Sequence, residues 1–112
     1  MSAGMLEWQD AMSKGGLSRA EYAAKLRDFV SRERDTAAIV QAALQHGETE
    51  KAWQMVRNVK KCAVELGARE LAQAAFSLEM AIRAGADTII SLKHFDAVAM
   101  DTMLAMSGFL AT

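Results

Sequence analysis

Few side chains in this sequence are of the types that carry out acid–base or nucleophilic chemistry. The chain has two histidines, His46 and His94, and one cysteine, Cys62. A histidine can take up a proton or a phosphoryl group near neutral pH, and a thiolate can attack an electrophile. No carboxylate pair, metal-ligand spacing, glycine-rich phosphate loop or nucleophile–base pair accompanies them. We therefore expect a protein that is not an enzyme and needs neither a metal nor a cofactor.

The clearest helical pattern lies between Thr49, a candidate N-cap, and Gly67. Its apolar positions, which at about 100° per residue share one face, are Ala52, Met55, Val56, Val59, Ala63 and Leu66. Opposite them lie Gln54, Arg57, Lys61 and Val64, with Trp53 and Lys60 on one flank. A solvated face with extended lysines is the simplest interpretation. The apolar residues beside these charges also fit a contact surface.

Further helices are expected on both sides of this one. A capping box at Ser18–Glu21 starts a helix that runs to the low thirties, with Tyr22, Leu26, Phe29 and Val30 at helical spacing. The next apolar set is Ile39, Val40, Ala43 and Leu44, followed by Gly47 as the C-cap. The pattern leaves open whether a break near residues 32–35 separates these two helices.

After Gly67 two more helices follow. The first has Leu71, Ala74, Ala75, Leu78 and Ile82 and stops at Gly85; the second, capped by Asp87 or Thr88, has Ile89, Leu92, Phe95, Ala99, Met103, Met106 and Leu110. Such short connections predict an all-α, up-and-down antiparallel bundle. Residues 1–17 form a lead-in in which Met5, Leu6, Trp8 and Met12 fit a short docking helix, and residues 18–112 form the bundle.

The composition narrows the class of protein. The 112 residues include no proline and seven glycines, which favours helices, and the net charge of -1 gives no reason to expect nucleic acid or a membrane surface as partner. One cysteine excludes an internal disulfide, and no apolar run reaches the roughly 18 residues of a membrane span. We expect a soluble cytoplasmic domain.

Residues 57–68 read RNVKKCAVELGA. This stretch resembles the active helix of histidine-containing phosphotransfer (HPt) domains, whose pattern is HxxKGxxxxLGA. Lys60 and the LGA sequence at 66–68 stand in register with the pattern. Arg57 occupies the position of the phosphorylatable histidine, and Lys61 that of the glycine.

The resemblance extends over about residues 17–110. Residues 46–50 take the place of the family's Gly-Asp-x-Glu type turn, and residues 22–29 are similar to its YxxLLxxF segment. The residues that match the pattern LGAxxLxxxAxxLExAxxxG are Leu66, Gly67, Ala68, Leu71, Ala75, Leu78, Glu79, Ala81 and Gly85. The resemblance implies a four-helix bundle of HPt type with an additional N-terminal helix.

The two substitutions change what the resemblance implies. In an active family member an exposed histidine accepts a phosphoryl group from a receiver-domain aspartate, and the lysine here matched by Lys60 balances the phosphoryl charge. Arg57 cannot replace the histidine because its guanidinium stays protonated and has no lone pair. Lys61 fills the space that the glycine leaves open. The implied protein binds phosphorelay partners without carrying phosphate.

The implied partner is the receiver domain of a response regulator or of a hybrid histidine kinase, in two-component signal transduction. A receiver presents an acidic pocket, which fixed positive charge and apolar contacts would complement. The expected partner-binding residues are Trp53, Gln54, Arg57, Lys60, Lys61 and Val64.

Two alternatives remain. A phosphocarrier would use His46 or His94. His46, at the end of a helix, lacks the motif's lysine and glycine around it and fits a surface or capping residue. His94, off the main stripe of the last helix, fits a partly exposed structural residue. A structural bundle would act by homo-oligomerisation, because Val98, Met100 and Leu104 lie off that stripe and add apolar surface.

Overall fold

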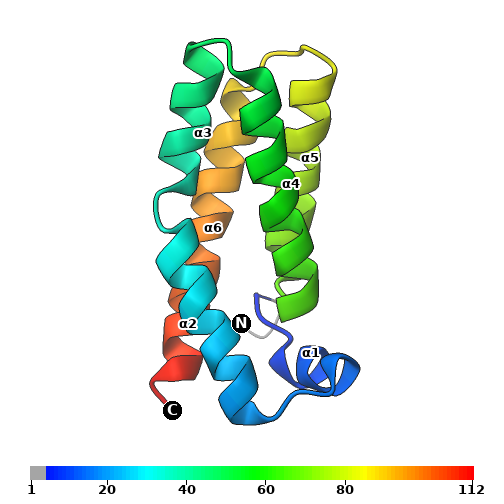
Figure 1. The fold of residues 1–112 in the computed structure, drawn as a ribbon, viewed down its shortest axis with the longest axis vertical. Helices are drawn as coiled ribbons and strands as arrows, with labels where there is room; N and C mark the ends of the chain where they lie inside the picture. The colour runs from blue at the N-terminus through cyan, green and yellow to red at the C-terminus, as the bar shows by residue number, and fades with distance from the viewer. Residues whose placement is uncertain (1–4) are drawn as a thin grey trace.

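The structure, a computed structural model, describes residues 5–112, and all regular secondary structure in that range is helical. The helices are α1 (Trp8–Gly15), α2 (Arg19–Glu33), α3 (Thr36–Gln45), α4 (Thr49–Leu66), α5 (Arg69–Arg83) and α6 (Ile89–Leu110). In Figure 1, α2 and α3 follow one another end to end, and α4, α5 and α6 lie beside this column with alternating chain direction. The expected all-α helical bundle is confirmed.

The core is formed by one apolar stripe from each long helix. On α4 the stripe has the predicted period, with Ala52, Val56, Val59, Ala63 and Leu66 buried, whereas Met55 is only partly buried. The largest fully buried side chains are Tyr22, Phe29, Phe95, Leu26, Leu71, Leu78, Met106, Val40, Val56, Val59 and Thr102. At roughly 25 cal/mol per Å² of buried apolar surface, these side chains dominate the free energy of folding.

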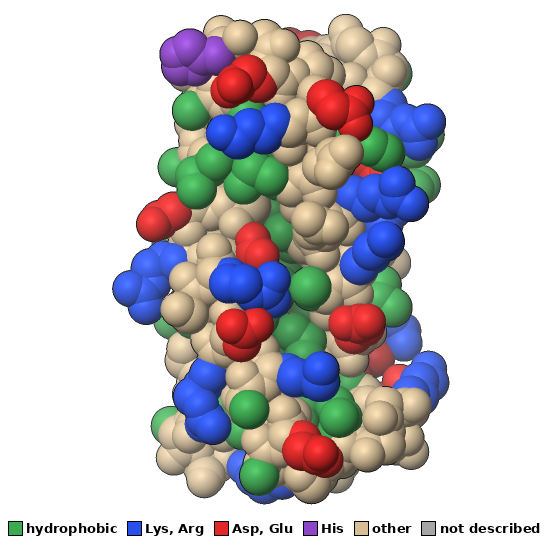
Figure 2. Space-filling view, in the orientation of Figure 1, with side chains coloured by type: hydrophobic (Ala, Val, Ile, Leu, Met, Phe, Trp, Pro, Cys, Tyr) green, Lys and Arg blue, Asp and Glu red, His purple; other side chains and the backbone are tan. Residues whose placement is uncertain are grey.

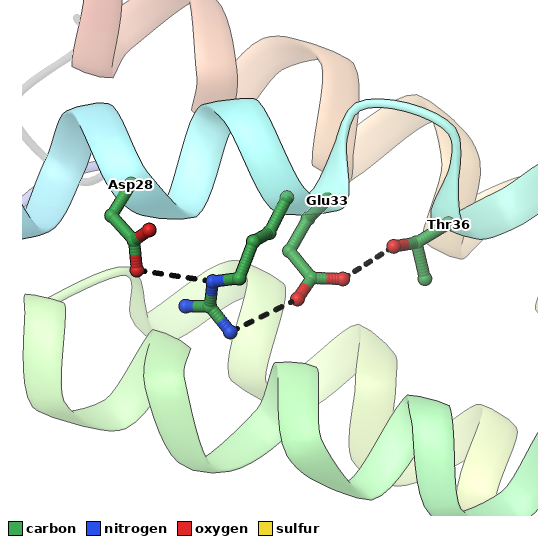
Figure 3. A network of polar contacts seen from close by, with 4 residues as sticks. Asp28, Glu33 and Thr36 are labelled. Atoms are coloured by element: carbon green, nitrogen blue, oxygen red, sulfur yellow. Dashed lines mark hydrogen bonds and ion pairs between the residues drawn. The ribbon is translucent and has the colours of Figure 1, made fainter.

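A real break separates α2 from α3, which answers the question that the periodicity left open. α2 ends at Glu33 and α3 begins at Thr36. Figure 3 shows the polar network at this junction: Arg32 Nε donates to Asp28 Oδ2 at 3.0 Å, its Nη1 lies 3.6 Å from Glu33, and the Thr36 hydroxyl donates to the other Glu33 oxygen. Thr36 is buried, so this hydrogen bond satisfies a hydroxyl that has left water.

The helix ends follow the expected signals with two exceptions. The C-cap of α3 is His46, and the predicted C-cap Gly47 lies one residue beyond it, with a φ of +74°. Ser18 caps α2 through the full capping box with Glu21. Thr88 is the N-cap residue of α6, and the neighbouring Asp87 side chain accepts from the Ile89 backbone N–H at 2.9 Å. The prediction of Thr49 as N-cap is wrong: α4 begins with Glu48 as N-cap, because the Glu48 amide bonds to the Ala43 carbonyl and closes α3 immediately before α4 starts.

Two isoleucines that we expected on buried stripes are exposed. Ile39 is 43% exposed because the α3 positions that face the core are Thr36, Val40 and Ala43, which leaves Ile39 beside the stripe. Ile89 is 66% exposed because it is the first residue of α6, at the end of the bundle. Apolar periodicity therefore located both helices but overestimated their buried faces.

α1 covers the end of the bundle that lies opposite the start of α6 (Figure 1). Its lead-in residue Glu7 donates its amide to the Gly67 carbonyl at 2.9 Å and forms an ion pair with Arg69 at 2.9 Å, and Leu6 and Ala11 are buried. Gly67 has φ of +81°, and a Cβ at this position would lie 2.6 Å from the Glu7 carbonyl oxygen. Glycine is thus required both by the turn and by the close approach of α1. Residues 1–4 of the expected lead-in lie outside the described range.

Candidate functional site

The outer face of α4 carries four of the six residues that the sequence marked as a contact surface. Gln54, Arg57, Lys61 and Val64 are all exposed, and Val64 is 66% exposed. Gln54 donates to Glu50 Oε2 at 3.2 Å one turn earlier. Since these positions lie opposite the core stripe, the predicted layout of the helix is confirmed for this face.

The other two residues, Trp53 and Lys60, are half-buried where α4 meets α5. Both bind Glu79 of α5, whose side chain is almost completely buried. Lys60 Nζ lies 2.7 Å from Glu79 Oε1, and the Trp53 indole N–H donates to Oε2 at 3.1 Å. The lysine of the motif is therefore held within the fold by a carboxylate instead of standing free on the outer face.

The environment of Glu79 keeps this carboxylate ionised. Burial raises the pKa of the Glu79 carboxyl, but the hydrogen bond and charge of Lys60, followed by the Trp53 hydrogen bond and the charge of Arg57, outweigh it. The net result is a pKa below the ordinary value for glutamate. A charged glutamate at this position balances the charge of Lys60, so the positive charge of the surface comes from other residues.

The indole of Trp53 is flanked by two guanidinium groups. The Arg57 guanidinium carbon lies 5.3 Å from the centre of the Trp53 ring, and that of Arg83, from α5, lies 5.4 Å from it. Between the same two helices, Lys60 Nζ lies 5.5 Å from the ring centre of Phe76. A cation within about 6 Å of a ring centre is attracted by the ring quadrupole, which favours these positions of the basic side chains.

We define the basic–aromatic face as the surface formed by Trp53, Arg57, Lys61, Phe76, Met80 and Arg83. Phe76 and Met80 are about half exposed, one helical turn apart on α5. Within residues 5–112 none of its three basic side chains makes an ion pair. Figure 2 shows Lys and Arg side chains along the side of the molecule where α4 and α5 lie, and others over the side formed by α2 and α3. The face combines unneutralised positive charge with exposed apolar groups.

Sequence reasoning missed the contribution of α5 to this surface. Phe76, Met80 and Arg83 follow the i, i+4, i+7 spacing of one helix face, and that signal was available. The burial of Glu79 could also have been predicted. It lies four residues after Ala75 and three before Ile82, which places it on the buried stripe of α5. A carboxylate at such a position requires a partner from a neighbouring helix.

Neither histidine lies in a setting that resembles the motif. His46 is exposed, and its Nδ1 donates to the Ala42 carbonyl at 2.7 Å, so it closes the end of α3. His94 is exposed on α6 and lines a shallow hollow with Glu70, Gln73 and Ser77, where a carboxylate would repel a phosphoryl group. Cys62 is a free, half-buried thiol.

In residues 5–112 no group of three or more His, Cys, Asp or Glu side chains could hold a metal ion. No described helix combines the length and the apolar character needed to span a bilayer.

Comparison of the chain with protein-family models, curated protein sequences and solved structures finds no match in any of the three. The function of the protein is therefore inferred from the residues of this chain and their arrangement.

Proposed function

We propose that this protein is a degenerate HPt domain of a two-component phosphorelay, with the up-and-down four-helix bundle of that family, and that it acts in the cytoplasm by binding a receiver domain or histidine kinase. It is not an enzyme and does not carry phosphate, because Arg57 occupies the phosphoacceptor position of the motif. The observation that carries the proposal is the exposed Arg57 guanidinium packed against Trp53 on α4.

The charge and shape of the basic–aromatic face support this partner. A receiver domain offers an acidic pocket around its aspartate, with apolar surface beside it. Arg57, Lys61 and Arg83 supply fixed positive charge, and Phe76 and Met80 supply apolar contact. Arg57, exposed on the outer face of α4, can bind a carboxylate of such a pocket in a bidentate manner through its guanidinium.

The half-burial of Lys60 defines the mode of binding. Its ammonium is bound to Glu79 and so contributes little net charge to the outer face. Binding would therefore depend on Arg57 and not on the lysine of the motif. Occupying a receiver without accepting phosphate makes the protein a competitor or modulator of a phosphorelay.

The test is a calorimetric titration of the protein with isolated receiver domains from the same organism. Arg57→Glu is expected to weaken binding by more than about tenfold, with an unchanged far-UV circular dichroism spectrum. Lys51→Glu is the matched control, because Lys51 is an exposed basic residue of the same helix on another side. Equal loss of affinity in both variants, or in neither, would contradict the proposal.

A further inference from the structure

α6 has apolar side chains on two opposite faces. One face packs in the core through Phe95, Met106 and Phe109. The other is exposed to solvent, with Ile90 83% exposed, Leu104 70% exposed and Met100 61% exposed. Large apolar side chains gathered on the exposed face of a helix can mark a contact surface. α6 is also the longest helix of the bundle, at 22 residues.

The exposed residues form a continuous stripe. Ile90, Lys93, Ala97, Met100, Asp101 and Leu104 are all exposed, and their spacing of three, four or seven residues places them on one face at about 100° per residue. We call this set the α6 stripe. Its position opposite the core makes it the part of α6 most accessible to a second helix.

The α6 stripe is complementary to itself in the antiparallel direction. A two-fold axis through Ala97 places Lys93 opposite Asp101 of a second copy, because each lies four residues, or about 6 Å, from Ala97. The same axis places Ile90 opposite Leu104, each seven residues away. Within residues 5–112 neither Lys93 nor Asp101 has an ion-pair partner.

We propose that two copies of this chain associate through the α6 stripe, antiparallel and centred on Ala97. The small side chain of Ala97 lets the two helices approach closely at the axis, and a shallow crossing angle of about 20° keeps the whole stripe in contact. The symmetry doubles each interaction, to give two Lys93–Asp101 ion pairs and two Ile90–Leu104 contacts. This proposal is independent of the proposed function, since the basic–aromatic face lies on α4 and α5.

Sedimentation equilibrium of the full chain from about 1 µM to about 1 mM covers the range in which a small interface associates. We expect a reversible dimer. Leu104→Glu is expected to weaken it by about tenfold or more, whereas Val64→Glu, which places the same charge at an equally exposed site on α4, leaves it unchanged. A wild-type chain that stays monomeric throughout, or equal effects of the two variants, would overturn the proposal.

Charge reversal tests the register. Lys93→Asp places two pairs of aspartates opposite one another and is expected to weaken the dimer by about tenfold. The double variant Lys93→Asp/Asp101→Lys restores both ion pairs and should recover most of the wild-type affinity. Failure of the double variant to recover would overturn the antiparallel arrangement.

Cross-linking provides a second readout that does not depend on affinity. In a Cys62→Ser background, Ala97→Cys should form a disulfide-linked dimer on mild oxidation, because the two copies of this position meet at the axis. Ile90→Cys should not, since its two copies would lie about 21 Å apart along the helices. Cross-linking of Ile90→Cys alone, or equally of both variants, would exclude this register.

Discussion

Lys60 on α4 and Glu79 on α5 form an ion pair with 2.7 Å between Nζ and Oε1, and Glu79 is only 4% exposed. An unpaired carboxylate at this depth would cost several kcal/mol in desolvation. The Trp53 indole binds the second oxygen, so both oxygens of Glu79 have donors. The three residues join the two helices that carry the basic–aromatic face and fix the position of the indole on which Arg57 rests.

Removing the lysine of this pair should destabilise the protein. Lys60→Met leaves the Glu79 carboxylate buried with only the indole as donor, and we expect a loss of about 2–3 kcal/mol in the free energy of unfolding. Lys61→Met makes the same chemical change at the neighbouring exposed position and should change stability by less than about 0.5 kcal/mol. Urea denaturation monitored by circular dichroism measures both. Equal stabilities of the two variants would show that the ion pair contributes nothing.

Glu79 also predicts how stability depends on acid pH. Its pKa is lower in the folded protein than in the unfolded chain, so its ionised form contributes stability above the unfolded pKa. This contribution is lost as the pH falls through the folded pKa. Glu79→Gln should therefore show a weaker loss of stability between about pH 5 and pH 2 than the wild type does. Parallel pH profiles for the two proteins would contradict the assignment.

The sequence was sufficient to predict the helices and the outer face of α4. Its apolar periods located each core stripe, and the capping box at Ser18 marked the start of α2. The sequence was not sufficient to predict contacts between helices. The pairing of Lys60 with Glu79 joins residues 19 positions apart on separate helices, and no local spacing specifies which faces meet.

The exposure of Ile39 and Ile89 could not be predicted from the sequence for a related reason. An apolar residue follows the same helical period whether or not another helix passes beside it, so periodicity alone does not reveal where a bundle ends. The start of α6 depends on local backbone geometry, which a pattern of residue types leaves undetermined. Thr88 is its N-cap residue, whereas the side chain that accepts from the Ile89 amide is that of Asp87.

Tyr22 predicts a loss of stability at alkaline pH. Its hydroxyl is fully buried and donates to the Leu66 carbonyl, and burial raises its pKa to about 12. The unfolded chain releases this proton near pH 10, so between about pH 10 and pH 12 the folded state holds more protons and stability falls as the pH rises. The loss from this group is at most about 2–3 kcal/mol. Tyr22→Phe should have a flatter alkaline profile, and an equally steep one would contradict this role.

The close contact between Gly67 and Glu7 leads to a prediction about the packing of α1. Gly67→Ala must adopt a positive φ, which costs about 1–2 kcal/mol, and must also displace the Glu7 carbonyl. Gly47→Ala is the control, because Gly47 has φ of +74° with nothing within 4 Å of the added carbon. We expect Gly67→Ala to be the more destabilised and to speed hydrogen exchange in α1. Equal effects of the two variants would mean that the approach of α1 imposes no constraint.

Restoring the motif provides the strictest test of the proposed function. The double variant Arg57→His/Lys61→Gly supplies both the nucleophile and the open surface that phosphotransfer requires. Incubated with a phosphorylated receiver that binds the protein, it should acquire a label that is lost in acid and stable in base. Asn58→His is the matched control, because it places an exposed imidazole on the same helix outside the motif position. We expect label on the double variant only, since transfer needs the acceptor in line with the receiver phosphate. Label on both variants would indicate unspecific transfer, and label on neither would contradict the family assignment of α4.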